Sequence, residues 1–199
     1  MRDYQAEYEG RVAFIRELVK NAGASGIVYG NSGGKDSALV GILCKAACDN
    51  TVGIIMPCAS KRNYGQDTDD GIAVAGQFGI ETRTVDLTAV REREMEELQK
   101  VCTLNSAAIN NIAPRLRMTT LYAIGAAENR LVAGTGNRSE IHMGYFTKWG
   151  DGASDFDVIA DLTATEVFEF LEYLNAPRCI IDKACLLYTS PSPRDPKTS

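Results

Sequence analysis

Four short strand-like runs alternate with longer stretches whose apolar residues recur at helical spacing. The runs predict buried strands at residues 27–29, 51–57, 81–87 and 130–134. The longer stretches predict helices over 4–19, 72–78, 88–102, 115–129 and 163–175, with another from a cap at Asp36 or Ser37 to about Cys48. Residues 135–157 show neither the helical nor the strand-like spacing of apolar residues. This alternation predicts one doubly wound, Rossmann-like α/β domain around a parallel sheet.

The loop after the first predicted strand is rich in glycine and hydroxyl groups. Glycine lets the backbone approach a ligand, and successive N–H groups at a helix N-terminus bind anions. An aspartate there would repel a phosphate unless a Mg²⁺ ion bridges the two. We therefore predict a phosphate-binding loop formed by Gly30, Asn31, Ser32, Gly33, Gly34, Lys35, Asp36 and Ser37.

Two familiar phosphate loops do not fit this segment. A Walker A loop needs a different glycine-to-lysine spacing and a hydroxyl residue where Asp36 stands. A dinucleotide fingerprint, G-x-G-x-x-G, is not present in GNSGGKDS. A simple tight turn would not require this set of side chains.

Composition excludes several other classes of protein. A formal charge of −5 argues against a surface that coats nucleic acid, and no apolar run approaches the roughly 18 residues of a membrane span. The N-terminus lacks an apolar signal core, so we expect a cytoplasmic protein. Six cysteines without a CxxC pair, together with one histidine, argue against a zinc site. Cys44 and Cys48 share one helical face and are expected to pack as small apolar residues.

The segment SGGKDS resembles the SGGxDS loop of the ATP pyrophosphatase (PP-loop) superfamily. That resemblance implies cleavage of ATP between its α- and β-phosphates and adenylation of a substrate oxygen. Residues 111–155 further resemble NAD synthetases, in the order N-x-x-x-R-x-R-M, G-T-x-x-x-x-E and G-[YF]-x-T-K-x-G-D-G-x-x-D. The likeness extends over roughly residues 10–184.

The family resemblance implies a role for each matched residue. Asp36 and Glu140 match Mg²⁺ ligands, and Thr135 matches a residue that contacts ATP, in addition to the loop from Gly30 to Ser37. Arg115, Lys148 and Asp155 match residues that hold deamido-NAD. The implied reaction joins ammonia to deamido-NAD at the expense of ATP, in a homodimer. His142 matches no catalytic position.

The sequence departs from the family pattern in two places. Ala164 stands where many members carry a lysine that reaches the ATP phosphates, and Lys35 or Lys61 could substitute. Residues 185–199 do not resemble the family, so the expected domain is 1–184, incomplete at its C-terminus, followed by an irregular tail. Because the chain begins about 30 residues before the loop, without space for a glutaminase domain of ~100 residues, free ammonia is the expected donor.

Two other functions fit the same residues. The chain could be an ATP-binding remnant without turnover, or a different PP-loop ATP pyrophosphatase. A tRNA-modifying member of that superfamily is disfavoured by the acidic charge and by the lack of CxxC spacing.

Overall fold

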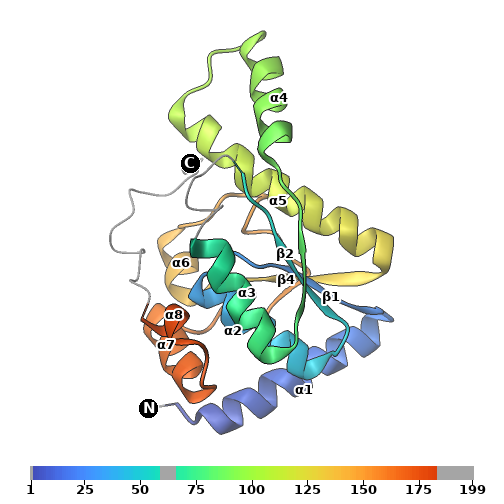
Figure 1. Ribbon diagram of the computed structural model, residues 1–199, viewed down its shortest axis with the longest axis vertical. Coiled ribbons are helices and arrows are strands. Elements are labelled where there is room, and N and C mark those ends of the chain that lie inside the picture. The colour runs from blue at the N-terminus through green and yellow to red at the C-terminus, as the bar shows by residue number, and fades with distance from the viewer. Residues whose placement is uncertain (1, 59–65, 183–199) are drawn as a thin grey trace.

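The computed structural model describes residues 2–58 and 66–182 and contains a parallel five-stranded sheet (Figure 1). The strand order is β3 (Glu81–Thr84), β2 (Thr51–Ile55), β1 (Gly26–Gly30), β4 (Arg130–Gly134) and β5 (Phe156–Asp157). The chain winds outward from β1 to β3 and then returns to the other side of β1, so β1 and β4 flank the switch point. The doubly wound, Rossmann-like prediction is confirmed, and the carboxyl ends of β1 and β4 mark the usual ligand edge.

Helices cover both faces of the sheet. Their bounds are α1 (Tyr4–Ala22), α2 (Lys35–Ala47), α3 (Gln66–Phe78), α4 (Thr88–Gln99), α5 (Ser106–Glu128), α6 (Arg138–Met143), α7 (Ala164–Tyr173) and α8 (Arg178–Ile181). In Figure 1, α5 crosses one side of the sheet, whereas α1 and α2 lie on the other. No helix in the described part of the chain is long and apolar enough to cross a membrane.

The alternation of side chains along β1 divides the core in two. Ile27 and Tyr29 pack with α1, α2 and α7 on one face of the sheet. Val28 lies on the opposite face, where it packs with side chains of β2, β4 and α5. All three side chains are completely buried, as expected for a central strand of a parallel sheet. Cys44 also lies in the first cluster and Cys48 packs against it, which confirms their predicted apolar role.

Several predicted helix boundaries were wrong. Asp36 and Ser37 are not caps, because α2 begins at Lys35 and Gly34 is its N-cap. Helix α5 begins at Ser106 rather than at 115, with Asn105 as its N-cap and Pro114 inside the helix. Helix α3 likewise begins at residue 66 instead of 72.

The segment without a detectable period contains α6 and β5, which the sequence did not predict. A six-residue helix and a two-residue strand are too short to produce a hydrophobic period, and α8, also missed, has only four residues. The available signal was local, since Asn137 and Glu140 form a capping box at the start of α6. Gly23 ends α1 with a φ of 61°, and Thr163 is the N-cap of α7.

Candidate functional site

The glycine loop connects β1 to α2 and is braced by its own side chains. The Ser32 backbone N–H donates to Ser37 Oγ at 3.3 Å, and Ser37 Oγ donates to the Gly34 carbonyl at 3.0 Å. Asn31 is buried, accepts from the Gly33 N–H at 3.3 Å and donates to the Gly71 carbonyl at 3.0 Å. The loop is therefore held in one shape beside the N-terminus of α2, where the first N–H groups lack intrahelical acceptors and an anion can bind.

Gly33 is required by both backbone conformation and space. Its φ is +69°, in the left-handed region that favours glycine. A Cβ atom at this position would lie 1.9 Å from the carbonyl oxygen of Asp67 in α3. Any side chain here would therefore push the loop away from α3.

Asp36 lies in the first turn of α2 and is held from two directions. Lys35 Nζ lies 2.5 Å from Asp36 Oδ2, and Asn137 Nδ2 donates to Asp36 Oδ1 at 3.0 Å. The Lys35 ammonium also lies 5.6 Å from the centre of the Phe168 ring. Lys35 thus places a cation beside the loop, while Lys61, the other suggested substitute for the family lysine, lies outside the described residues. Ala164 itself is buried at the start of α7.

Glu140 reaches the same region from α6. The Asn137 side chain accepts from the Glu140 N–H at 3.0 Å, and Glu140 Oε2 accepts from the Asn137 N–H at 3.3 Å. Asn137 is fully buried and therefore links the capping box to Asp36. Burial, with a further contribution from the Asp36 charge, raises the pKa of Glu140 to about 7.

One cavity of about 360 Å³ collects most of the predicted ATP and metal residues. It opens between the glycine loop, the end of β4, α6 and the segment before β5. Its lining is Ser32, Gly34, Asp36, Ser37, Thr135, Gly136, Glu140, Ile141, Phe146, Asp151, Gly152, Ser154 and Asp157. A smaller cavity next to it is lined by Gly30, Asn31 and Ser32, together with residues of β2 and α3 and with Arg117. Ser32 borders both cavities.

Asp157 is a site residue that the sequence reasoning missed. Its Oδ2 accepts from the Gly136 N–H at 3.1 Å and its Oδ1 accepts from the Ile159 N–H at 3.2 Å. Burial raises its pKa to about 6 despite these hydrogen bonds. Arg117 was also missed, although it belongs to the matched R-x-R-M segment, and its Nε donates to the Met56 carbonyl at 3.1 Å.

The three residues expected to hold deamido-NAD are not among those that line the larger cavity. Arg115 and Lys148 do lie together, because Arg115 Nε and Nη2 each donate to the Lys148 carbonyl at 3.2 Å. Asp155 supports the sheet instead. Its Oδ2 accepts from the Val132 N–H at 2.8 Å, and its Oδ1 accepts from the Tyr122 hydroxyl at 3.2 Å. His142 lies exposed on α6.

The carboxylates fit a magnesium ion better than a metal caged by protein alone. Within residues 2–58 and 66–182, no group of three or more His, Cys, Asp or Glu side chains is arranged to hold a metal by itself. Mg²⁺ commonly binds through one or two carboxylates, with water and substrate phosphate completing its shell. Asp36 and Glu140 on one cavity meet that requirement.

The fold and the glycine loop place the chain in the nucleotide-binding α/β class with PP-loop architecture. The family model for NAD synthase matches residues 7–188, so the chain belongs to the NAD synthase family. Curated relatives include an NH(3)-dependent NAD(+) synthetase of Carboxydothermus hydrogenoformans, 43% identical over 92% of this chain and 75% of that protein. The Archaeoglobus fulgidus protein of the same name is 42% identical over 85% of this chain and 68% of its own length.

Solved structures agree with this assignment. A structure named NMN synthetase from Francisella tularensis has a TM-score of 0.87 and 33% identity, covering 93% of this chain and 76% of that one. The NH3-dependent NAD synthetase of Campylobacter jejuni has a TM-score of 0.82 and 33% identity, with 91% and 77% of the two chains covered. The chain thus spans about three quarters of the length of these structures.

Proposed function

We propose that the protein converts deamido-NAD to NAD with ammonia as the nitrogen donor and ATP as co-substrate. The observation that carries this proposal is the meeting of the glycine loop, Asp36 and Glu140 at one cavity. Its chemical identity is supported by relatives named NH(3)-dependent NAD(+) synthetase at 37–43% identity.

The proposed reaction has two steps. The nicotinate carboxylate of deamido-NAD attacks the α-phosphate of ATP, pyrophosphate leaves, and an acyl adenylate forms. Ammonia then attacks the acyl carbon, loses a proton and expels AMP, which leaves the amide. The chain would mainly hold the reactants in line and offset charge, with the loop N–H groups, Lys35 and Thr135 contacting phosphate.

Asp36 and Glu140 would hold Mg²⁺ in this proposal. When bound, the ion neutralises triphosphate charge and polarises the phosphate that is attacked. Burial first, and the Asp36 charge second, raise the pKa of Glu140, so a negative charge on Glu140 is poorly compensated in this cavity. A divalent cation would correct that imbalance.

The proposed dinucleotide site consists of Arg115, Lys148 and Asp155. Arg115 and Lys148 are exposed neighbours, and their cationic groups suit a pyrophosphate and a carboxylate. Asp155 would support the dinucleotide site indirectly, through its hydrogen bonds with the Val132 N–H of β4 and with the Tyr122 hydroxyl. We also propose that the protein is a homodimer. Sedimentation analysis distinguishes a dimer from a monomer.

The reaction is tested by supplying the purified protein with Mg·ATP, deamido-NAD and an ammonium salt. NAD and pyrophosphate should appear together, whereas glutamine in place of the ammonium salt should yield no NAD. Asp36→Asn should abolish turnover, and Asp49→Asn, at an exposed aspartate just beyond the C-terminal end of α2, should not. Nicotinate mononucleotide is the competing substrate to include, given the name of the Francisella structure.

Each alternative predicts a different result. Mg·ATP binding without release of pyrophosphate would indicate an ATP-binding remnant. Faster amidation of nicotinate mononucleotide than of deamido-NAD would show that the mononucleotide is the substrate. Pyrophosphate release without NAD would indicate another PP-loop reaction.

A further inference from the structure

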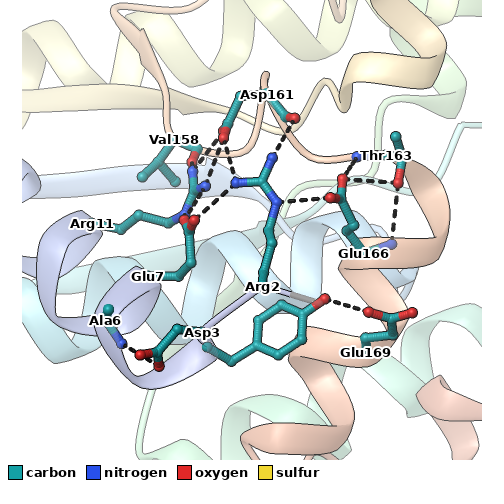
Figure 2. Close-up of polar contacts among 11 residues, drawn as sticks. Arg2, Asp3, Ala6, Glu7, Arg11, Val158, Asp161, Thr163, Glu166 and Glu169 are labelled. Carbon is teal, nitrogen blue, oxygen red and sulfur yellow. Dashed lines mark hydrogen bonds and ion pairs between the residues drawn. The ribbon is translucent and has the colours of Figure 1, made fainter.

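A cluster of charged side chains fastens the N-terminal region to the segment between β5 and α7 (Figure 2). Arg2 Nε donates to Glu166 Oε1 at 2.7 Å, and its Nη1 donates to Glu7 Oε1 at 2.9 Å. Hydrogen bonding from Arg2, the largest influence, lowers the pKa of Glu166 to about 2. The second arginine of the cluster, Arg11, also contacts Glu7, at 2.6 Å from its Nη2 to Oε2.

Arg11 makes the most direct connection to that segment. Its Nη1 and Nη2 donate to the two carboxylate oxygens of Asp161 at 2.8 and 2.9 Å. Nη1 also donates to the backbone carbonyl of Val158. The Arg11 side chain is 12% exposed and that of Asp161 is 56% exposed, so the ion pair is shielded from solvent mainly on the Arg11 side. Arg11 therefore fixes both the backbone and a side chain of residues 158–161.

The fastened segment in turn holds the beginning of α6. Asp157 Oδ2 accepts from the Gly136 N–H, and the Leu162 carbonyl accepts from the Arg138 N–H at 2.8 Å. The Ala164 N–H donates to Ser139 Oγ at 3.2 Å. These contacts surround Asn137, whose capping box with Glu140 and hydrogen bond to Asp36 place both proposed metal carboxylates.

We propose that Arg11 is a positioning residue that sets the place of Glu140 through the 157–163 segment. The inference rests on the proposed function, because it assigns Glu140 to the Mg·ATP site. The elements between Arg11 and Glu140 cannot hold themselves in place, since β5 has two residues and α6 has six. Helices of that length depend on tertiary contacts.

The chain offers a matched control on the same helix. Arg16 also lies on α1 and also donates to backbone carbonyls, those of Ala46 and Ala47 at the end of α2, at 2.9 and 3.4 Å. Its contacts do not involve the 157–163 segment. Arg11→Met and Arg16→Met therefore each remove an arginine from α1, but only the first releases the segment that supports α6.

The first measurement needs neither metal nor nucleotide. Hydrogen–deuterium exchange of peptides covering 136–143 should become faster in Arg11→Met and remain unchanged in Arg16→Met. The second measurement is calorimetric titration with Mg·ATP and with ATP in EDTA. Arg11→Met should weaken Mg·ATP binding about tenfold, in the range found for groups that orient metal ligands, and should leave metal-free ATP binding unchanged.

Asp161→Asn provides a second route if Arg11→Met fails to fold. It retains an oxygen acceptor for Arg11 but removes the charge, so the same two effects should appear in smaller size. Equal exchange and equal Mg·ATP affinity in the Arg11 and Arg16 variants would overturn the positioning role. Wild-type protein that binds ATP equally with and without Mg²⁺ would instead overturn the proposed metal site, so the two failures are distinguishable.

Discussion

Glu140→Gln is expected to stabilise the metal-free protein at neutral and alkaline pH, although it should remove activity. In the folded protein, burial first and the Asp36 charge second raise the pKa of Glu140 from 4.5 to about 7. The folded state therefore binds the Glu140 proton more tightly than the unfolded chain. This contribution to stability is fully present below pH 4.5 and is lost as pH rises to about 7.

The size of the effect follows from the two pKa values. At 1.36 kcal/mol per pH unit, the whole difference corresponds to about 3 kcal/mol. About 2 kcal/mol of that falls between pH 5.5 and 8, and solvent at the mouth of the cavity reduces it further. Glutamine has a similar shape and can still accept from the Asn137 N–H, so the capping box is retained.

Urea unfolding in EDTA at several pH values measures this difference. The stability of Glu140→Gln should exceed that of the wild type by a margin that grows by about 1–2 kcal/mol from pH 5.5 to 8. Glu172→Gln, at an exposed position on α7, is the control and should follow the wild-type curve. Parallel curves for wild type and Glu140→Gln would refute the reasoning, because Glu140 would then titrate alike in both states.

Two further substitutions test the packing that positions the site. Gly33→Ala should abolish ATP binding measured by calorimetry, because its Cβ would lie 1.9 Å from the Asp67 carbonyl oxygen. Gly76→Ala, on α3 where an added Cβ would meet nothing within 4 Å, is the control and should retain binding. Equal binding by both variants would contradict the loop geometry. Tyr29→Phe should leave stability unchanged or raise it by about 1 kcal/mol in urea unfolding, because the buried Tyr29 hydroxyl finds no hydrogen-bond partner within the described residues; a loss above that size would show that the hydroxyl is satisfied.

The order of strands and helices could be predicted from the sequence alone. Apolar runs, alternation and helical spacing are local properties of the chain, and they identified β1, β2, β3, β4 and most helices. The glycine loop was also predictable, because all of its functional atoms lie within one strand-to-helix turn. Within the loop, the position of the cap was the error, since Gly34 rather than Asp36 or Ser37 precedes the helix.

Only the tertiary structure decided which distant groups meet. Asn137 and Asp36 are 101 positions apart and come together because β4 pairs with β1 at the switch point of the sheet. Asp157 enters the same cavity from β5, a strand too short to show any period. Arg11 and Asp161, 150 positions apart, form their contact only once α1 has packed beside the β5–α7 segment. Local sequence patterns report the conformation of neighbouring residues. The raised pKa values of Glu140 and Asp157 depend instead on burial and on charges that only the whole fold brings together.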